Sequence, residues 1–207
     1  MIESNRIPHA IMLTGSAGVG KLPLAITFAQ RILNDPSNNL EHPDLRFVFP
    51  IIKDKEKHIT VSNDLLRQFR KHVISNPYTT IEEWIAQIGE QKTAMIYTEE
   101  GAEILKIANM KPYTGERKVI LVWLPELMHE SCANKLLKVL EEPPLDTIFV
   151  LVSDSPEQVL GTIKSRCQII EVPPINEEAL REELTKEFEF TEEQLRYLVH
   201  ASRGSWS

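Results

Sequence analysis

Residues 15–22 read Gly15-Ser16-Ala17-Gly18-Val19-Gly20-Lys21-Leu22, directly after the apolar run Ala10-Ile11-Met12-Leu13. This spacing of glycines and lysine fits the phosphate-binding loop, whose backbone amides face phosphate oxygens. We expect Lys21 to reach the terminal phosphates. Leu22, however, stands where the motif carries the Ser or Thr that ligates magnesium. The segment predicts a strand, a loop and a helix that could bind ATP or ADP without hydrolysing it; a glycine turn without a ligand is the alternative.

A second test of the loop comes from the buried strand expected at residues 119–123. Working P-loop ATPases place metal-holding acids at the end of such a strand. Here the strand ends in Trp123 and Leu124, and the nearest carboxylate is Glu126, after a proline. Glu126 could be a displaced catalytic acid, but a surface glutamate is the simpler interpretation. Because both metal positions are changed, the sequence predicts no metal site and no hydrolysis by this chain.

Apolar runs alternate with amphipathic segments along most of the chain. Strands are expected at residues 10–13, 47–49, 95–97, 119–123, 147–152 and 168–170. Helices are expected at residues 21–33, 98–110 and 156–164, and after the capping residues Ser62 and Ser131. The alternation predicts an α/β fold, a parallel sheet covered by helices on both faces.

After Pro173-Pro174 the pattern changes to helices alone. Asn176 starts one helix, and Thr191 opens a capping box that starts another. We therefore expect a P-loop domain over residues 1–173 and the start of a small helical domain over residues 174–207. We also expect a fragment, truncated at both ends, in which Trp206 would pack on something absent from this chain.

Composition and cysteine usage fit a cytoplasmic globular protein. No apolar run approaches the roughly 20 residues that cross a bilayer, and residues 1–10 lack the apolar segment of a signal peptide. Cys132 and Cys167 match no zinc spacing. We expect both thiols to be free in a reducing compartment, with a single disulfide as the alternative.

The formal net charge is −7, and the acidic excess lies between Glu171 and Glu193. No stripe of Lys and Arg with interleaved aromatic residues appears, so tight nucleic-acid binding by this chain alone is disfavoured. The acidic stretch is most simply a solvated helix face; a docking surface for a basic partner is the alternative.

Ser165-Arg166-Cys167 lies between the helix expected at residues 156–164 and the last strand. An arginine there could donate two parallel hydrogen bonds to phosphate oxygens. A lone arginine at a helix end more often caps carbonyl groups at the surface. Arg166 is thus a candidate site residue whose role depends on its context.

That context is a set of motifs that occur in order along the chain. They are Gly15 through Lys21, His42-Pro43-Asp44-Leu45, Asn134-Lys135-Leu136-Leu137-Lys138-Val139-Leu140-Glu141-Glu142-Pro143-Pro144, and Ser165-Arg166-Cys167. Together they resemble the bacterial clamp-loader subunits of DNA polymerase III, the delta-prime and gamma/tau group of the AAA+ class. The last two motifs are the specific ones, and residues 50–95 carry none.

The resemblance implies a P-loop AAA+ domain followed by a small helical lid domain. It also implies a division of labour: gamma-type subunits hydrolyse ATP, whereas delta-prime subunits often lose the hydrolytic residues and offer the SRC arginine to a neighbour's ATP. Leu22, Trp123 and Leu124 match the second pattern. Arg166 is then expected to act in trans as an arginine finger, which in GTPases contributes roughly 10³- to 10⁵-fold in rate.

The resemblance also bears on two nucleotide sensors. Ser153 stands at the strand end where the group has its nucleotide-sensing polar residue, and a plain strand-end serine is the alternative. Gly204-Ser205 resembles the start of the second sensor motif, but Ser207 occupies the place of its arginine. We expect this second sensor to be absent.

The implied partners are the gamma/tau and delta subunits, with the sliding clamp and primed DNA reached through the complex. Residues 34–40 hold no cysteine, whereas many members carry a zinc module there, so no zinc is expected. The group's N-terminal helix and C-terminal collar are missing, so this piece alone could be monomeric. Two rival functions stay open: an active clamp-loader ATPase that uses Glu126, and a P-loop phosphotransferase acting on a small molecule.

Overall fold

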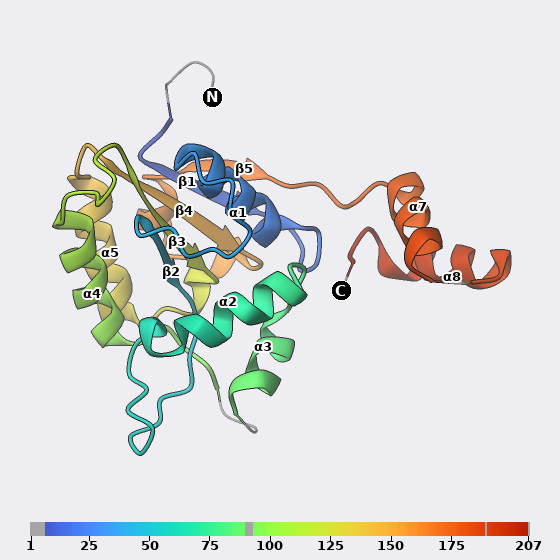
Figure 1. Ribbon diagram of the computed structural model, residues 1–207, viewed down its shortest axis with the longest axis horizontal. Coiled ribbons are helices and arrows are strands. Elements are labelled where there is room, and N and C mark those ends of the chain that lie inside the picture. Colours follow the sequence, from blue (N-terminus) through green and yellow to red (C-terminus); the bar gives the residue numbers. More distant parts are fainter. Residues whose placement is uncertain (1–6, 90–92, 189, 207) are drawn as a thin grey trace.

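A five-stranded sheet lies at the centre of the part of the chain that the structure describes (Figure 1). The structure is a computed structural model that describes residues 7–89, 93–188 and 190–206. The strands are β1 (Ala10–Thr14), β2 (Leu45–Val48), β3 (Lys118–Trp123), β4 (Thr147–Ser153) and β5 (Gln168–Glu171). They lie in the order β2-β3-β4-β1-β5, and every neighbouring pair is parallel. The predicted parallel sheet is confirmed.

Helices cover both faces of the sheet, as the alternation predicts (Figure 1). One face carries α1 (Lys21–Ile32), α2 (Leu66–Ser75) and α3 (Ile81–Ile88), and the other carries α4 (Thr98–Asn109), α5 (Glu130–Glu141) and α6 (Gly161–Lys164). Side chains of β1 alternate between the two layers: Ile11 and Leu13 pack under α1, and Met12 packs on the opposite side. This period of two is what a strand buried on both faces requires.

Residues 50–95 complete the first of these layers with aromatic side chains. The ring of Phe69 in α2 stacks on Phe49 with centroids 3.9 Å apart, and Trp84 in α3 meets both rings edge-on. The Trp84 Nε1–H group donates to the Pro50 carbonyl at 2.7 Å, so the buried indole has a partner. The sequence reasoning missed α3, although Thr80 and Glu83 form a capping box at its start.

Two of the predicted helix caps are wrong. Ser62 lies inside the short helix η1 (Ser62–Leu65), where its hydroxyl donates to the Glu100 carboxylate at 2.7 Å. Glu100 is buried, and burial raises the pKa of its carboxyl group. Helix α5 is capped by His129 instead of Ser131: the His129 Nδ1 atom accepts from the Ser131 amide at 3.2 Å.

Two predicted elements are also wrong. In place of the strand expected at residues 95–97, Met95 and Ile96 form isolated bridges to Ile51 and Met128. Residues 156–164 form two short pieces, η3 (Pro156–Gln158) and α6, instead of one helix. The interruption falls at Val159, which is extended and buried in the second layer. A further short helix, η2 (Pro125–Leu127), follows β3.

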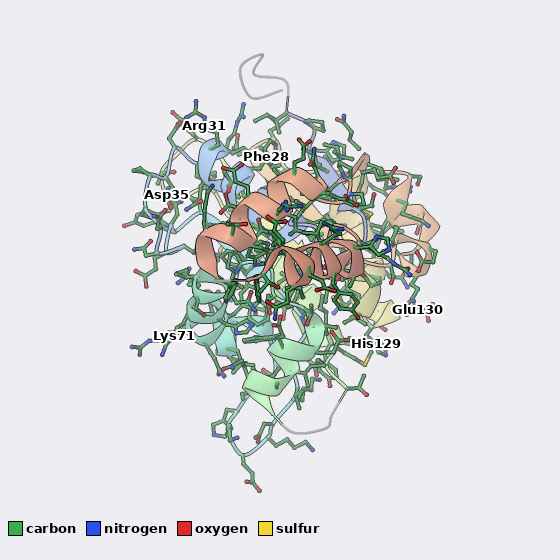
Figure 2. The ribbon with its side chains drawn as sticks, turned by 90° about the vertical axis from the view of Figure 1, so that its right-hand side faces the viewer. Phe28, Arg31, Asp35, Lys71, His129 and Glu130 are labelled. Atoms are coloured by element: carbon green, nitrogen blue, oxygen red, sulfur yellow. The ribbon has the colours of Figure 1, made fainter. Side chains whose placement is uncertain are left out.

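The two helices after Pro173-Pro174 form a small separate core. Helices α7 (Glu177–Glu187) and α8 (Glu192–Ser202) pack through Leu180, Leu195 and Val199. The predicted caps are confirmed: Asn176 accepts from two amides of α7, and Thr191 forms a capping box with Gln194. Viewed from their side, the two helices lie in front of the sheet and its covering helices (Figure 2). The division of the chain near residue 173 stays a prediction.

The acidic stretch and the two cysteines agree with what the sequence predicts. The described glutamate side chains of α7 and of the first turn of α8 are exposed, which agrees with a solvated face. Cys132 and Cys167 are free, as predicted. Burial raises the pKa of the Cys132 thiol to about 12 and that of Cys167 to about 11, so both thiols stay protonated at neutral pH. Among the described residues, no helix has the length and apolar character needed to cross a bilayer.

Candidate functional site

The predicted phosphate-binding loop connects β1 to α1 at the carboxyl edge of the sheet. Its glycines adopt backbone conformations that other residues avoid, with φ of 144° at Gly15, 75° at Gly18 and 91° at Gly20. A β-carbon at Gly15 would lie 2.6 Å from the Val172 carbonyl oxygen, so that position has no room for a side chain. The backbone of the loop therefore requires glycines at these positions.

The lysine of the predicted phosphate-binding loop is paired inside the protein. The Lys21 side chain is 2% exposed, and its Nζ atom lies 2.7 Å from Oδ1 of Asp154, which directly follows β4. The same ammonium group donates to the Ser16 carbonyl within the loop. Lys21 thus neutralises a carboxylate of its own chain at the place where a bound triphosphate would lie.

Glu126 holds the partner of that lysine in place. Its Oε1 atom accepts hydrogen bonds from the Asp154 amide at 2.7 Å and from the Ser155 amide at 2.9 Å. Glu126 is half-buried, so its interpretation as a surface glutamate is wrong. Since one carboxylate oxygen is already committed to two amides, the residue stabilises the turn after β4.

Residues from two distant segments contact the loop from outside. A β-carbon at Gly20 would lie 3.2 Å from the ring of Tyr78, in the α2–α3 connection. The Trp206 amide donates to the Gly18 carbonyl at 3.0 Å, and the Trp206 and Tyr78 rings lie 5.9 Å apart. The cavity that remains beside Lys21 measures about 10 Å³. This is about the volume that one water occupies.

The contacts of Trp206 correct one expectation from the sequence. Trp206 packs on residues of this same chain and not on something absent from it. The Ser205 hydroxyl donates to the Ala17 carbonyl at 3.1 Å, so the segment that resembles the second sensor reaches the phosphate loop. Ser207, in the place of that sensor's arginine, lies outside the described residues.

The changed metal positions belong to the hydrophobic core. Leu22, Trp123 and Leu124 are each at most 4% exposed. The Trp123 ring lies 5.7 Å from that of Phe69, within the aromatic cluster under α2. Magnesium prefers oxygen ligands, and none of these three side chains supplies one. Ser153 is fully buried at the end of β4, and its Oγ atom has no hydrogen-bond partner among the described residues; its sensor role stays a prediction.

Arg166 lies away from the loop, at the end of α6 and next to β5. Its side chain is 33% exposed and forms an ion pair with Glu141 at 2.7 Å. Its Nη1 atom also donates to the Thr162 carbonyl at 2.9 Å. The lysine at the loop is thus enclosed, whereas the arginine of the SRC motif remains accessible at the surface.

Asp44 of the HPDL motif has a structural role at the opposite edge of the sheet. Its buried carboxylate accepts from the Thr114 amide and hydroxyl at 2.8 and 2.7 Å and from the Tyr113 amide at 2.5 Å. Burial alone would raise the pKa of Asp44, but these hydrogen bonds outweigh it and hold the pKa below its usual range. The motif anchors the loop before β3.

Sequence reasoning missed the residues that surround Lys21 and Arg166. Tyr78 lies in a stretch without any recognised motif, so no local signal pointed to it. Asp154 did carry a signal, because an acid just past a central parallel strand lies at the edge where ligands bind. Glu141 was part of a motif used for the resemblance, and its partner could be found only from the fold.

Comparisons with known proteins agree with this geometry. Residues 1–176 match the protein family described as DNA polymerase III, delta subunit. DNA polymerase III subunit delta' of Bacillus subtilis strain 168 is 26% identical over 200 residues, covering 90% of this chain and 48% of that protein. The Escherichia coli K12 subunit delta' is 34% identical over 103 residues, covering 50% of this chain and 31% of that protein. The chain thus matches about half or less of these relatives' own lengths.

Two solved structures share the fold. A DNA polymerase III gamma-subunit-related protein of Thermotoga maritima has a TM-score of 0.58 and 20% identity, covering 92% of this chain and 50% of that one. The RuvB Holliday junction branch migration motor of the same organism has a TM-score of 0.56 and 13% identity, covering 98% and 52%. Both share the parallel α/β fold of this chain, and the chain belongs to the family described as DNA polymerase III, delta subunit.

Proposed function

We propose that this chain is a non-hydrolysing clamp-loader subunit that completes a neighbouring subunit's ATP site with Arg166. Its place would be the cytoplasm, in a complex with gamma/tau and delta subunits that loads a sliding clamp onto primed DNA. These partners follow from the family and from the gamma/tau relatives. In isolation the chain would have no enzymatic activity, and it would require neither nucleotide nor zinc.

One observation carries this proposal: Lys21 is neutralised by Asp154 in a loop that has about 10 Å³ of free space. A P-loop subunit that hydrolyses ATP needs this lysine on the phosphates and a magnesium ion held by oxygen ligands. Here the lysine pairs within the chain, and Leu22 and Trp123 are core residues. The loop then stabilises the fold, and the neighbouring subunit hydrolyses ATP.

The accessible arginine supports the second half of the proposal. The Arg166 side chain is 33% exposed at the sheet edge formed by β5. A planar guanidinium can bind phosphate oxygens through two parallel hydrogen bonds and stabilise negative charge in phosphoryl transfer. Ile169 in β5 is also 51% exposed, which leaves apolar surface beside the arginine for a partner.

The rival functions receive less support. A gamma-like ATPase would need Glu126 as a catalytic acid, but its Oε1 atom accepts from the Asp154 and Ser155 amides. A small-molecule phosphotransferase would need room for two substrates at the phosphate loop, where about 10 Å³ is free. Both rivals would require Tyr78 and Trp206 to leave the loop.

The test is Arg166→Ala in the full-length chain, reconstituted with its ATP-hydrolysing partner subunits. We expect the ATPase rate of the complex to fall several-fold, because one active site loses its finger, with assembly intact by size-exclusion chromatography. Arg181→Ala is the matched control: Arg181 is also an exposed arginine paired with a glutamate, on α7. An unchanged rate with Arg166→Ala would remove Arg166 from the mechanism.

A further inference from the structure

The two motifs specific to this family meet at a single ion pair. Glu141, from the segment Asn134 to Pro144, accepts from the Nη2 atom of Arg166 at 2.7 Å. The Nη1 atom of the same guanidinium donates to the Thr162 carbonyl at 2.9 Å and to the Ser165 hydroxyl at 3.3 Å. Arg166 is therefore folded back onto its own subunit and held by three oxygens of it.

Glu141 is poorly placed for the stability of its own helix. It is the last residue of α5, where the helix dipole disfavours a negative charge and favours a positive one. Glu142, the next residue, is also exposed and forms no ion pair among the described residues. The contact with Arg166 gives Glu141 a counter-charge that α5 itself does not provide.

The pair is exposed enough to exchange partners. The Arg166 and Glu141 side chains are 33% and 45% exposed, in contrast to Lys21 at 2%. Exposed ion pairs are weak because water and salt screen them. A nucleoside triphosphate carries several negative charges and offers the guanidinium the same kind of acceptor oxygens as a carboxylate.

We propose that Glu141 is a counter-ion that keeps Arg166 paired on its own subunit until a neighbouring subunit's nucleoside triphosphate displaces the Glu141 carboxylate. This inference rests on the proposed function and adds a regulatory element to it. While the pair is closed, the carboxylate neutralises the positive charge that phosphoryl transfer requires. When the neighbouring subunit binds, its triphosphate competes for the guanidinium, and Arg166 moves from Glu141 to the phosphates. Glu141 thus acts through Arg166, as a positioning residue.

The test uses Glu141→Gln in the full-length chain within the reconstituted complex, without clamp or DNA. Glutamine keeps the size of the side chain and one acceptor oxygen but removes the charge. We expect kcat for ATP hydrolysis to rise about two- to fivefold, as the loss of one exposed ion pair allows. The KM for ATP should change less, because the freed guanidinium acts on the transition state. Glu142→Gln, one residue further on, should leave both constants unchanged.

A second arm separates this inference from the proposed function. In an Arg166→Ala background, Glu141→Gln should have no effect, because its action passes through the arginine. Arg166→Ala could lower the rate while Glu141→Gln leaves the rate unchanged or lowers it. That result overturns the role of Glu141 and keeps Arg166 as the arginine finger. A rise of equal size in the Arg166→Ala background also overturns the role of Glu141. If Arg166→Ala itself has no effect, both proposals fail.

Discussion

Two cations of this molecule, each paired with a carboxylate at 2.7 Å, lie in opposite environments. Lys21 is 2% exposed and its partner Asp154 is 23% exposed, whereas Arg166 and Glu141 are 33% and 45% exposed. The first pair lies in the predicted phosphate-binding loop, beside Tyr78, and the second lies at the edge of the sheet formed by β5. A buried pair is costly to break because one charge stays without a partner, whereas an exposed pair exchanges readily. The comparison therefore supports our proposal that the phosphate loop stabilises the fold and that the surface arginine acts on a neighbouring subunit.

The largest loss of stability is expected at Trp123, which stands where working P-loop ATPases carry a metal-holding acid. Trp123→Ala should lower the free energy of unfolding by about 3–5 kcal/mol, because it removes a core indole that packs on Phe69. Urea denaturation measures the change. Leu145→Ala, at a fully exposed leucine, is the control and should leave the midpoint unchanged. A small loss at Trp123 would mean that this position is not part of the core.

The second-largest loss of stability is expected at the buried ion pair between Lys21 and Asp154. Lys21→Ala leaves Asp154 without its counter-charge and should cost about 1–3 kcal/mol of stability, less than a fully enclosed pair because Asp154 keeps some contact with water. Lys106→Ala, at an exposed pair with Glu103, provides the control and should have no measurable effect. Equal results for the two lysines would contradict the closed state of the loop.

Asp44 extends the comparison to a buried carboxylate whose partners all lie within the chain. Asp44→Asn should cost about 1–2 kcal/mol at neutral pH through weaker hydrogen bonds to Thr114 and Tyr113. The pKa of Asp44 is lowered in the folded state. Its stabilisation is therefore present above the unfolded pKa of about 3.9 and is lost as the pH falls through the lower folded value. The difference in stability between the variant and the parent should shrink as the pH falls below about 4; a difference that stays constant would refute this role.

The smallest effect on stability is expected at the proposed finger. Arg166→Ala should change the free energy of unfolding by about 0.5 kcal/mol or less, because its ion pair is exposed. Thermal unfolding of the purified chain measures this. A loss as large as that of Lys21→Ala would make Arg166 a structural residue and would remove the contrast between the two cations.

The strands and long helices could be predicted because their patterns are local. A run such as 147–152 is buried on both faces, and the caps at Asn176 and Thr191 involve neighbouring residues. The errors occur where distant contacts override local preference. Ser62 has the chemistry of a cap, but Glu100, far along the chain, takes its hydroxyl.

The candidate site was predicted by residue type but not by arrangement. The sequence indicated that Leu22 and Trp123 cannot hold a metal, and that Arg166 could act on phosphate. It could not indicate that Lys21 is paired or that Trp206 returns to the loop, because these contacts join segments far apart in the chain. Pairings of this kind depend on the order of the strands and on the path of the chain between them.

The central claim is tested most directly by two variants in one ATPase assay of the reconstituted full-length complex. Lys21→Gln keeps a donor for Asp154 but removes the charge that an active P-loop requires, and Arg166→Ala removes the proposed finger. We expect an unchanged rate with Lys21→Gln and a several-fold lower rate with Arg166→Ala. A lower rate with Lys21→Gln and an unchanged rate with Arg166→Ala would contradict it.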